Sequence, residues 1–489
     1  MRDWPILSMI IFTPLVGVFL TLIIPGRYEK AIKAINIVCG LVTVLLAGLI
    51  WHLYETGKGG FQLKESHVWV SDLNIYYSVG VDGIGVAMTL LNAIVFFTGA
   101  LTMWTLDKRV KEYYAFTGLL VFGVFGVFVA TDLFAFFFFY EVAVLPMYLL
   151  IAIWGSTKKE YAAMKLTLYL LAGSALLFPS LIALFTTGGG TWNLSELAAL
   201  GKSGGFSRDF QIFVYPFLYL GFGILAGMWP FHGWSPTGHV AAPTSVSMLH
   251  AGVLMKLGAF GILRVAMPIL PQGAAYWAEP FAVCATIGIV YGAFVAMRQT
   301  DFKFVIGFSS VSHMGIVLLG LNVFAMDSAN VDGINGAVFQ MFAHGVMTAL
   351  FFSAVGFIYD QTHDRDIRNF GGLVSQVPVA ATFFIIAGLC GMGVPGFASF
   401  WAELLVFIAA IKTFPVLGVA AIAGLVFTAA YMLRVLGKAM FGPVNEKWNK
   451  LEDTDLWLST PRVLLIGVLI LFGFLPSLML DMISVRWGF

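Results

Sequence analysis

The sequence MWPFHGWSPTGHVAAPTSVSMLHAGVLMKLGAFG, residues 228–261, ends one apolar run and starts another. Its first half is rich in glycine and proline, and its second half is an apolar run that carries His250 and Lys256. A lysine near the middle of an apolar helix is costly unless it faces the protein interior, water or a partner charge. This stretch therefore predicts a broken membrane helix beside a buried ionisable group, an arrangement from which transporters build ion paths. The alternative is a lysine that extends to the membrane interface.

The composition is that of a membrane protein. Sixty per cent of the 489 residues are hydrophobic and only 11% are charged, as in polytopic helical membrane proteins. The net charge of +1, with scattered basic residues, gives no support for nucleic-acid binding. Cys39, Cys284 and Cys390 lie singly in apolar runs, so we interpret them as packing residues. Because Arg2 is balanced by Asp3 and no clear cleavage site follows, we interpret the first apolar segment as a retained helix rather than a signal peptide.

Apolar windows long enough to cross a bilayer recur along the whole chain. We therefore predict an all-α polytopic membrane protein with about fourteen transmembrane helices. The 378–411 window is longer than one helix needs and contains Gly391, Pro395 and Gly396, so we expect two half-helices with an unwound centre. The predicted spans are 4–24, 31–53, 84–104, 113–130, 132–153, 164–187, 210–229, 244–267, 277–297, 304–324, 332–357, 378–411, 415–440 and 461–484.

Basic residues gather in the odd-numbered connections between these spans. Because cytoplasmic loops of membrane proteins carry an excess of lysine and arginine, we expect the odd connections in the cytoplasm and both termini on the periplasmic or outer side. The basic residues concerned are Arg27, Lys30, Lys33, Lys108, Arg109, Lys111, Lys158, Lys159, Arg298, Lys303, Arg365, Arg368, Lys447 and Lys450.

The two predicted breaks, near 227–243 and 391–399, are separated by about five spans. An odd number of crossings inverts the second copy of a repeat, so this spacing suggests two five-helix units of opposite orientation. The predicted organisation is an N-terminal three-helix segment, a first repeat, an inverted second repeat and a C-terminal loop with the last helix, at 1–112, 113–267, 277–440 and 441–489.

Several ionisable residues lie within apolar runs. An ionised, unpaired Glu141 in FAFFFFYEVAVLPMYLL would be strongly disfavoured, so this carboxyl group is expected to be protonated or paired. Glu403 follows the second break, where helix ends leave backbone groups free to hold water or ions. His313 and His344 lie in SSVSHMG and FQMFAHGVMTALFF, and histidine can shuttle protons. Together with Lys256 these residues are predicted to form a proton relay. The alternatives are structural hydrogen bonds, helix caps or packing.

Two further basic residues have open roles. Lys165 in YAAMKLTLYLL lies near the start of the helix after Glu141, and it is either an interfacial anchor or a partner for that carboxylate. His250 precedes Lys256 by six residues, which places the two on different sides of the helix. The sequence contains no His-x-x-x-His metal spacing, no four-cysteine cluster and no glycine-rich nucleotide loop, so we expect no metal or redox cofactor in this chain.

The chain resembles the antiporter-like M (chain 4) subunits of respiratory complex I, the proton-translocating NADH–quinone oxidoreductase. The resemblance covers most of residues 110–440, and it implies fourteen helices, two inverted repeats with helices seven and twelve broken, and a location in the bacterial inner membrane. The matching segments are FYEVAVLPMY, WPFHGWSPTGHVAAPTSVSMLHAGVLMKLGAFGILR, RQTDFKFVIGFSSVSHMG, HGVMTALFF, HDRDIRNFGGL and GVPGFASFWAELLVF.

The resemblance also implies residue roles and partners. Glu141 looks like the glutamate of helix five, Lys256 like the central lysine of helix eight, and Glu403 like the terminal glutamate of helix twelve. His313 and His344 occupy the positions of connecting polar residues. Proton transfer would be coupled to electron transfer in partner subunits, which would hold FMN, iron–sulfur clusters and quinone. The expected partners are neighbouring antiporter-like subunits, the long arm helix of subunit L and the lipid bilayer, with no nucleic acid.

This sequence departs from the family pattern at a functional position. The family normally has a lysine on helix seven as partner to the helix-five glutamate, and Leu225 stands there. Thr237 and Gly238 replace a frequent Asp-Ala pair, and His250 is more typical of subunit L and of cation/proton antiporters. Either Lys165 or His250 takes the place of the missing partner, or this half-channel works differently.

Two related functions stay open at this stage. One is a Mrp-type sodium/proton antiporter subunit, and the other is the equivalent subunit of a membrane-bound hydrogenase or a ferredoxin- or F420-linked complex. Only a short segment, 485–489, follows the last predicted helix, whereas subunit L carries a long amphipathic arm. The sequence therefore favours an M-type subunit.

Overall fold

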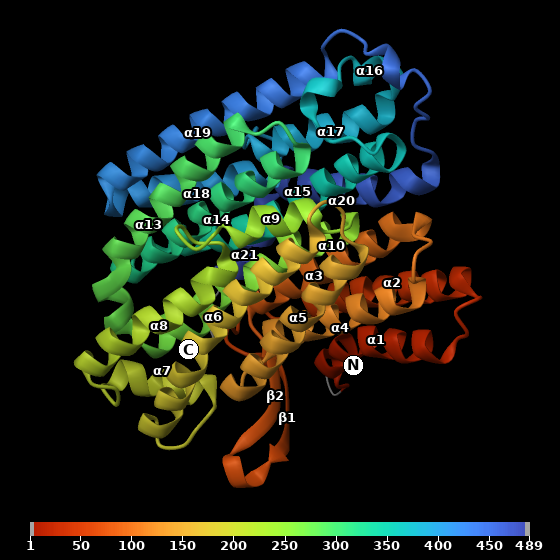
Figure 1. Ribbon diagram of the computed structural model, residues 1–489. Coiled ribbons are helices and arrows are strands. Elements are labelled where there is room, and N and C mark those ends of the chain that lie inside the picture. Colours follow the sequence, from red (N-terminus) through yellow and green to blue (C-terminus); the bar gives the residue numbers. More distant parts are fainter. Residues whose placement is uncertain (1–3, 485–489) are drawn as a thin grey trace.

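Thirteen helices in the described part of the chain are long and apolar enough to cross a membrane, which confirms the predicted all-α polytopic fold. The structure is a computed structural model and describes residues 4–484 (Figure 1). Arg2, Asp3 and the tail 485–489, which the sequence analysis used, lie outside the described residues. The helices concerned are α1 (Ile6–Ile23), α2 (Glu29–Leu53), α3 (Gly83–Thr102), α4 (Val110–Val129), α5 (Leu133–Trp154), α6 (Lys159–Thr187), α8 (Arg208–Ala226), the continuous α10–α12 (Thr244–Ile269), α13 (Pro271–Arg298), α14 (Phe302–Met326), α15 (Val331–Thr362), α19 (Pro415–Val435) and α20 (Leu456–Phe474).

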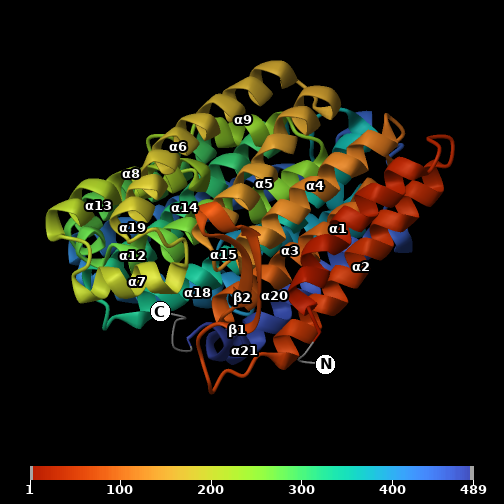
Figure 2. The ribbon, with the colours of Figure 1, turned by 90° about the horizontal axis from the view of Figure 1, so that it is seen from below.

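Shorter elements fill the connections. Strands β1 (Gln62–Val70) and β2 (Ile75–Val81) pair as an antiparallel hairpin that the sequence analysis did not predict, and the hairpin projects from the helical body (Figure 1). Seen from below, α1 and α2 lie at one end of the body and α7 and α13 at the other (Figure 2). The remaining helices are α7 (Leu194–Ser203), α9 (Trp234–Ala241), α16 (Leu373–Gln376), α17 (Pro378–Gly391), α18 (Ala398–Thr413), α21 (Pro476–Ile483), the π-helical η6 (Leu436–Met440) and the 3-10 turns η1 (Ser71–Leu73), η2 (Met103–Thr105), η5 (Ile367–Asn369) and η7 (Glu446–Trp448).

The helices are interrupted at the two glycine-rich stretches. Helix α8 ends at Ala226 and is capped by Gly227, and the chain turns before α9 begins at Trp234. Helix α17 ends at Gly391, and α18 begins at Ala398. The predicted 378–411 span is therefore two helices of 14 and 16 residues, each too short to cross a bilayer alone. Gly227 and Gly393 have φ values of 77° and 66°, a backbone region that side chains other than glycine rarely adopt.

Hydrogen bonds join the connections at each end of the helical body. Among the even-numbered connections, Thr131 N–H donates to Ser78 O and Leu133 N–H donates to Trp192 O. Among the odd-numbered ones, Trp154 Nε1 donates to Lys108 O at 2.6 Å. Ile367 N–H likewise donates to Thr300 O at 2.7 Å. Even-numbered connections thus bond to one another, and odd-numbered connections bond to one another. We expect this pattern when each successive span crosses the helical body.

The helix that carries Lys256 is irregular and closely packed. The α-helical turn α11 (Met255–Gly261) lies between the π-helical turns η3 (His250–Leu254) and η4 (Ile262–Ala266). A Cβ atom added at Gly258 would lie 2.3 Å from Phe222 O of α8, so the two backbones are in direct contact. Small residues commonly allow such close approach between membrane helices. Lys256 is therefore held on a rigid element in the middle of the protein.

A buried ion pair fixes this helix to the N-terminal segment. Both guanidinium nitrogens of Arg264, in η4, donate to the carboxylate of Asp82 at 2.6 Å, and both side chains are 3% exposed. Asp82 also accepts from Gly85 N–H as the N-cap of α3. Burial alone would raise the pKa of Asp82, but the Arg264 charge and these hydrogen bonds hold the pKa of this carboxyl below its ordinary value of 3.8. The pair joins the start of α3 to the end of the Lys256 helix.

We expect Asp82→Asn to destabilise the protein by about 3–5 kcal/mol, because it leaves the Arg264 charge buried without a counter-charge. Since the pKa of Asp82 is lower in the folded than in the unfolded chain, its stabilisation is full above the ordinary pKa and is lost as the pH falls through the folded value. The measurement is the temperature at which this chain becomes insoluble in heated membranes, with the exposed Asp72→Asn as control. An equal melting temperature for Asp82→Asn and the control would contradict the prediction.

Candidate functional site

Lys256 is completely buried in α11. Its Nζ donates to the carbonyl of Ala251, in the preceding π-helical turn, and lies 2.7 Å from Nδ1 of His344 on α15. An ammonium group taken out of water needs such partners. Single π-helical turns inside α-helices occur often at functional sites, and here the turn contains the carbonyl that Lys256 contacts.

The contacts continue from His344 to Glu403. The rings of His344 and His313 have centroids 5.1 Å apart, and both rings are buried. His313 Nδ1, on α14, lies 3.1 Å from Glu403 Oε1 on α18. Three helices, α14, α15 and α18, thus bring side chains from later in the sequence to Lys256.

Gln340 completes this group of contacts. It lies one turn before His344 on α15, and its Nε2 is 3.1 Å from His313 Nδ1 and 3.2 Å from Glu403 Oε1. We name Lys256, His344, His313, Gln340 and Glu403 the central polar row. Four of its atoms have no hydrogen-bond partner among residues 4–484, namely His344 Nε2, His313 Nε2, Gln340 Oε1 and Glu403 Oε2. The row therefore has free capacity to accept or donate protons along its length.

Glu141 lies apart from this row. It is half-buried on a face of α5 that also carries the exposed side chains of Phe138 and Leu145. Its Oε1 accepts a hydrogen bond of 2.5 Å from Ser174 Oγ on α6. Glu141 is thus placed near the outer surface of the described chain, with a neutral hydroxyl group as its partner.

Neither substitute partner considered for Glu141 is bonded to it. None of the hydrogen bonds or ion pairs described for residues 4–484 joins Glu141 to Lys165 or His250. Lys165 Nζ instead contacts Thr237 Oγ1 at 3.3 Å, and Leu225 is fully buried as an apolar residue. Neither Lys165 nor His250 is therefore in contact with Glu141 in the described chain, because α5 turns this residue outward, and a half-channel that works differently stays a prediction.

His250 belongs to a different group of side chains. Its ring stacks on Trp234 with centroids 5.1 Å apart and lies 4.2 Å from the ring of His239. Both His250 nitrogens lack a partner among the described residues. A Cβ atom on Gly238 would lie 3.0 Å from His250 Cε1, so two departures from the family pattern, Gly238 and His250, are in contact.

The sequence analysis missed two buried basic residues outside the row, His239 and Lys303. His239, in the last turn of α9, lies with its ring 4.2 Å from that of His250. Lys303 is 3% exposed although it stands at the second position of α14, and it was counted only among the basic loop residues. The available signal for His239 was a histidine in the turn-rich half of the 228–261 stretch. The sequence around Lys303 did not indicate that this residue is buried, because its burial arises only from the tertiary fold.

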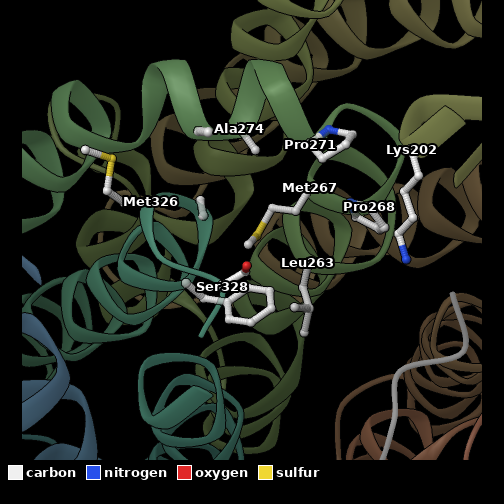
Figure 3. Close-up of a pocket in the computed structure, with 11 residues that line it drawn as sticks. Lys202, Leu263, Met267, Pro268, Pro271, Ala274, Met326 and Ser328 are labelled. Atoms are coloured by element: carbon white, nitrogen blue, oxygen red, sulfur yellow. The ribbon is translucent and has the colours of Figure 1, made fainter. Parts of the chain in front are cut away.

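Other features do not add to this site. Within residues 4–484, no group of three or more His, Cys, Asp or Glu side chains is arranged to hold a metal ion. A hollow of about 490 Å³ beside α12, shown in Figure 3, is lined mainly by apolar side chains such as Leu263, Met267 and Pro271. No residue of the central polar row lines it.

The central polar row falls within a segment that matches a known family. Residues 130–428, more than half of the chain, match the family described as NADH:quinone oxidoreductase/Mrp antiporter, TM. The chain belongs to this family. The NADH-quinone oxidoreductase subunit M of Rickettsia bellii (strain RML369-C) is 33% identical over 98% of this chain and 97% of that protein. The family resemblance seen in the sequence is therefore confirmed.

Two solved structures share the fold. A chain of the respiratory complex I from Thermus thermophilus with bound NADH superposes with a TM-score of 0.86 at 25% identity, covering 98% of both chains. A chain of the membrane-bound sulfane sulfur reductase, an archaeal respiratory membrane complex, superposes with a TM-score of 0.85 at 22% identity, covering 95% of this chain and 75% of that one. The similarity to the sulfane sulfur reductase chain shows a shared fold and nothing more.

We expect Gly238→Ala to destabilise the protein by about 1–3 kcal/mol, because the added methyl group would press on the buried ring of His250. The loss of stability caused by Gly238→Ala should become smaller in a His250→Ala background, where the ring is absent. The measurement is a double-mutant cycle of melting temperatures. Independent, additive effects of the two substitutions would show that the contact is absent.

Proposed function

We propose that this chain is a membrane-arm subunit of a redox-driven proton pump of the NADH–quinone oxidoreductase type. The observation that carries the proposal is the central polar row, which links Lys256 to Glu403 through two buried histidines. The names of the similar proteins, NADH-quinone oxidoreductase subunit M and respiratory complex I, support the choice of complex. No specific observation favours the Mrp-type or hydrogenase-type alternatives over this one.

The row suggests the order of proton transfer. Lys256 can give a proton from Nζ to Nδ1 of His344, and the neutral lysine that remains can take up another. The unpartnered Nε2 atoms of His344 and His313 are the sites through which the proton would pass between the rings. His313 Nδ1 can then donate to Glu403 Oε1. A change of charge in a neighbouring subunit would change how often each of these side chains carries a proton.

Gln340 provides a control point at the end of the row. Its amide contacts both His313 Nδ1 and Glu403 Oε1, which are themselves in contact. When His313 Nδ1 carries no proton, it accepts a hydrogen bond from the Gln340 amide. When His313 Nδ1 carries a proton, it donates to the Glu403 carboxylate, and the Gln340 amide must rotate away. Rotation of one side chain would thus accompany each transfer.

Electron transfer belongs to partner subunits in this proposal. FMN, iron–sulfur clusters and quinone would be held there, and coupling would reach this chain through contacts and charge. The outward face of Glu141 suggests where one contact lies, because a carboxylate facing lipid tails is costly. A neighbouring antiporter-like subunit would cover this face and supply the cation that Leu225 does not. The long arm helix of subunit L is a further expected partner.

The proposal also includes the orientation of the chain in the membrane. The basic odd-numbered connections favour a cytoplasmic location for those loops, with both termini on the periplasmic side of a bacterial inner membrane. Residues 113–267 and 277–440 would form two inverted repeats. The helix interruptions after Gly227 and after Gly391, near the end of each unit, support this division.

The proposal predicts that Lys256→Met lowers proton translocation per NADH oxidised by about tenfold or more, because methionine fills the same space without a transferable proton. The test measures dye-detected proton uptake by membrane vesicles that contain the whole complex, with the exposed Lys438→Met as control. Unchanged translocation in Lys256→Met would overturn the proposal.

A second prediction ranks the two buried carboxylates. Glu403→Gln should lower translocation more than Glu141→Gln, because Glu403 is in the central polar row and Glu141 contacts a serine at the surface of the chain. The exposed Glu446→Gln serves as the reference for a neutral substitution. A larger loss in Glu141→Gln would contradict the order derived from the geometry.

A further inference from the structure

The connection between α17 and α18, residues 392–397, is a non-helical break within the predicted span 378–411. Gly393 and Gly396 in this break have φ values of 66° and 103°, a backbone region that favours glycine. The hydroxyl group of Ser399, in the first turn of α18, donates to Cys390 O near the end of α17 at 2.6 Å. The two helices are therefore bonded across the break, and the path of the chain between them depends on glycine.

The two carboxylate oxygens of Glu403 have different surroundings. Glu403 lies in the second turn of α18 and is 2% exposed. Its Oε1 is 3.1 Å from His313 Nδ1 and 3.2 Å from Gln340 Nε2, and so faces the central polar row. Its Oε2 is buried and has no hydrogen-bond partner among residues 4–484. The position of the carboxylate is therefore set by the two contacts of Oε1 and by whatever lies against Oε2.

Gly393 lies directly against this second oxygen. A Cβ atom added to Gly393 would lie 2.6 Å from Glu403 Oε2 and 3.5 Å from Glu403 Cδ. Real Cβ atoms essentially never come closer than 3.0 Å to another heavy atom, so a side chain at position 393 requires the carboxylate to move. Because the carboxylate is the end of a flexible side chain, it would move more easily than the backbone. Such a movement would lengthen the contacts of Oε1 with the central polar row.

Gly396, three residues further along the same break, provides an internal comparison. Its φ of 103° is also a conformation that residues other than glycine rarely adopt. A Cβ atom added there would meet only Phe474, at 3.8 Å, which is an ordinary contact distance. Both positions therefore need glycine for the backbone conformation, but only Gly393 lies against an ionisable group of the central polar row.

We propose that Gly393 is a positioning residue for proton transfer between His313 and Glu403. This inference rests on the proposed function. The absence of a side chain at position 393 lets Glu403 keep Oε1 on His313 and Gln340 while Oε2 occupies the space beside the break. The distance from His313 Nδ1 to Oε1 is 3.1 Å, near the upper end of the range over which a proton is transferred directly. A displaced carboxylate would therefore interrupt the row at this step.

The first test compares Gly393→Ala with Gly396→Ala in membrane vesicles that contain the whole complex. We expect Gly393→Ala to lower proton translocation per NADH oxidised by about tenfold or more, because displacement of a reacting group by about 1 Å has large effects on rate. Gly396→Ala imposes backbone strain in the same break without touching Glu403, so its translocation should stay close to the native value. Equal losses in the two variants, or no loss in Gly393→Ala, would overturn the positioning role.

The second test asks whether the effect of Gly393→Ala depends on the carboxylate. Glu403→Asp shortens the side chain by one methylene group and draws the carboxylate away from position 393. The fold-loss of translocation caused by Gly393→Ala should therefore be smaller in the Glu403→Asp background, whereas the effect of Gly396→Ala should be the same in both backgrounds. If Gly393→Ala prevents assembly, the same comparison uses the temperature at which the chain becomes insoluble in heated membranes, and Glu403→Asp should raise it. An effect of Gly393→Ala that is independent of residue 403 would refute the proposal.

These outcomes separate the positioning role from the proposed function. If Lys256→Met abolishes translocation while Gly393→Ala behaves like Gly396→Ala, the positioning role fails and the pump assignment stands. If Lys256→Met leaves translocation unchanged, the pump assignment fails as well.

Discussion

The structure depends on one constraint, the cost of placing charged groups in an apolar interior. Three deeply buried charged side chains each have a polar neighbour: Lys256 has Ala251 O and His344, Glu403 has His313, and Arg264 has Asp82. Such pairs contribute little net stability, but removal of one partner leaves the other at a high cost. The membrane helices are therefore fixed relative to one another at the points where these pairs lie.

The irregular backbone follows from the same constraint. A regular helix uses all its carbonyl groups internally, whereas Lys256 needs an acceptor nearby. The π-helical turn η3 supplies the carbonyl of Ala251, and the interruption before Ala398 allows α18 to place Glu403 beside His313. Glycine makes both arrangements possible, by close helix contact at Gly258 and by a positive φ at Gly393. Deviations from ideal helices are thus concentrated around the central polar row.

The positions that the resemblance marks as departures from the family pattern lie in two places. With Leu225 on α8, Glu141 has no cation from this chain and bonds to Ser174. His250 is accommodated because Gly238 has no side chain, and its ring lies against His239.

The sequence alone determined the membrane class, the positions of the spans, the glycine-rich interruptions and the family. The membrane class, the spans and the interruptions follow from local composition and periodicity, which each segment carries by itself, whereas the family was indicated by the resemblance of whole motifs. It also identified Lys256, His313, His344 and Glu403, because an ionisable residue in an apolar run is conspicuous. The hairpin β1–β2 and the burial of Lys303 left no such local signal.

The tertiary structure alone decided which of these residues meet. Lys256 and His344 are 88 positions apart, and Gln340 and Glu403 are 63 positions apart, so their contacts depend on how α11, α15 and α18 pack. It also turned Glu141 outward and away from its expected partners, since helix rotation is set by neighbouring helices and not by the residues of one span. The sequence specified the chemical groups, and packing among distant helices specified their connections.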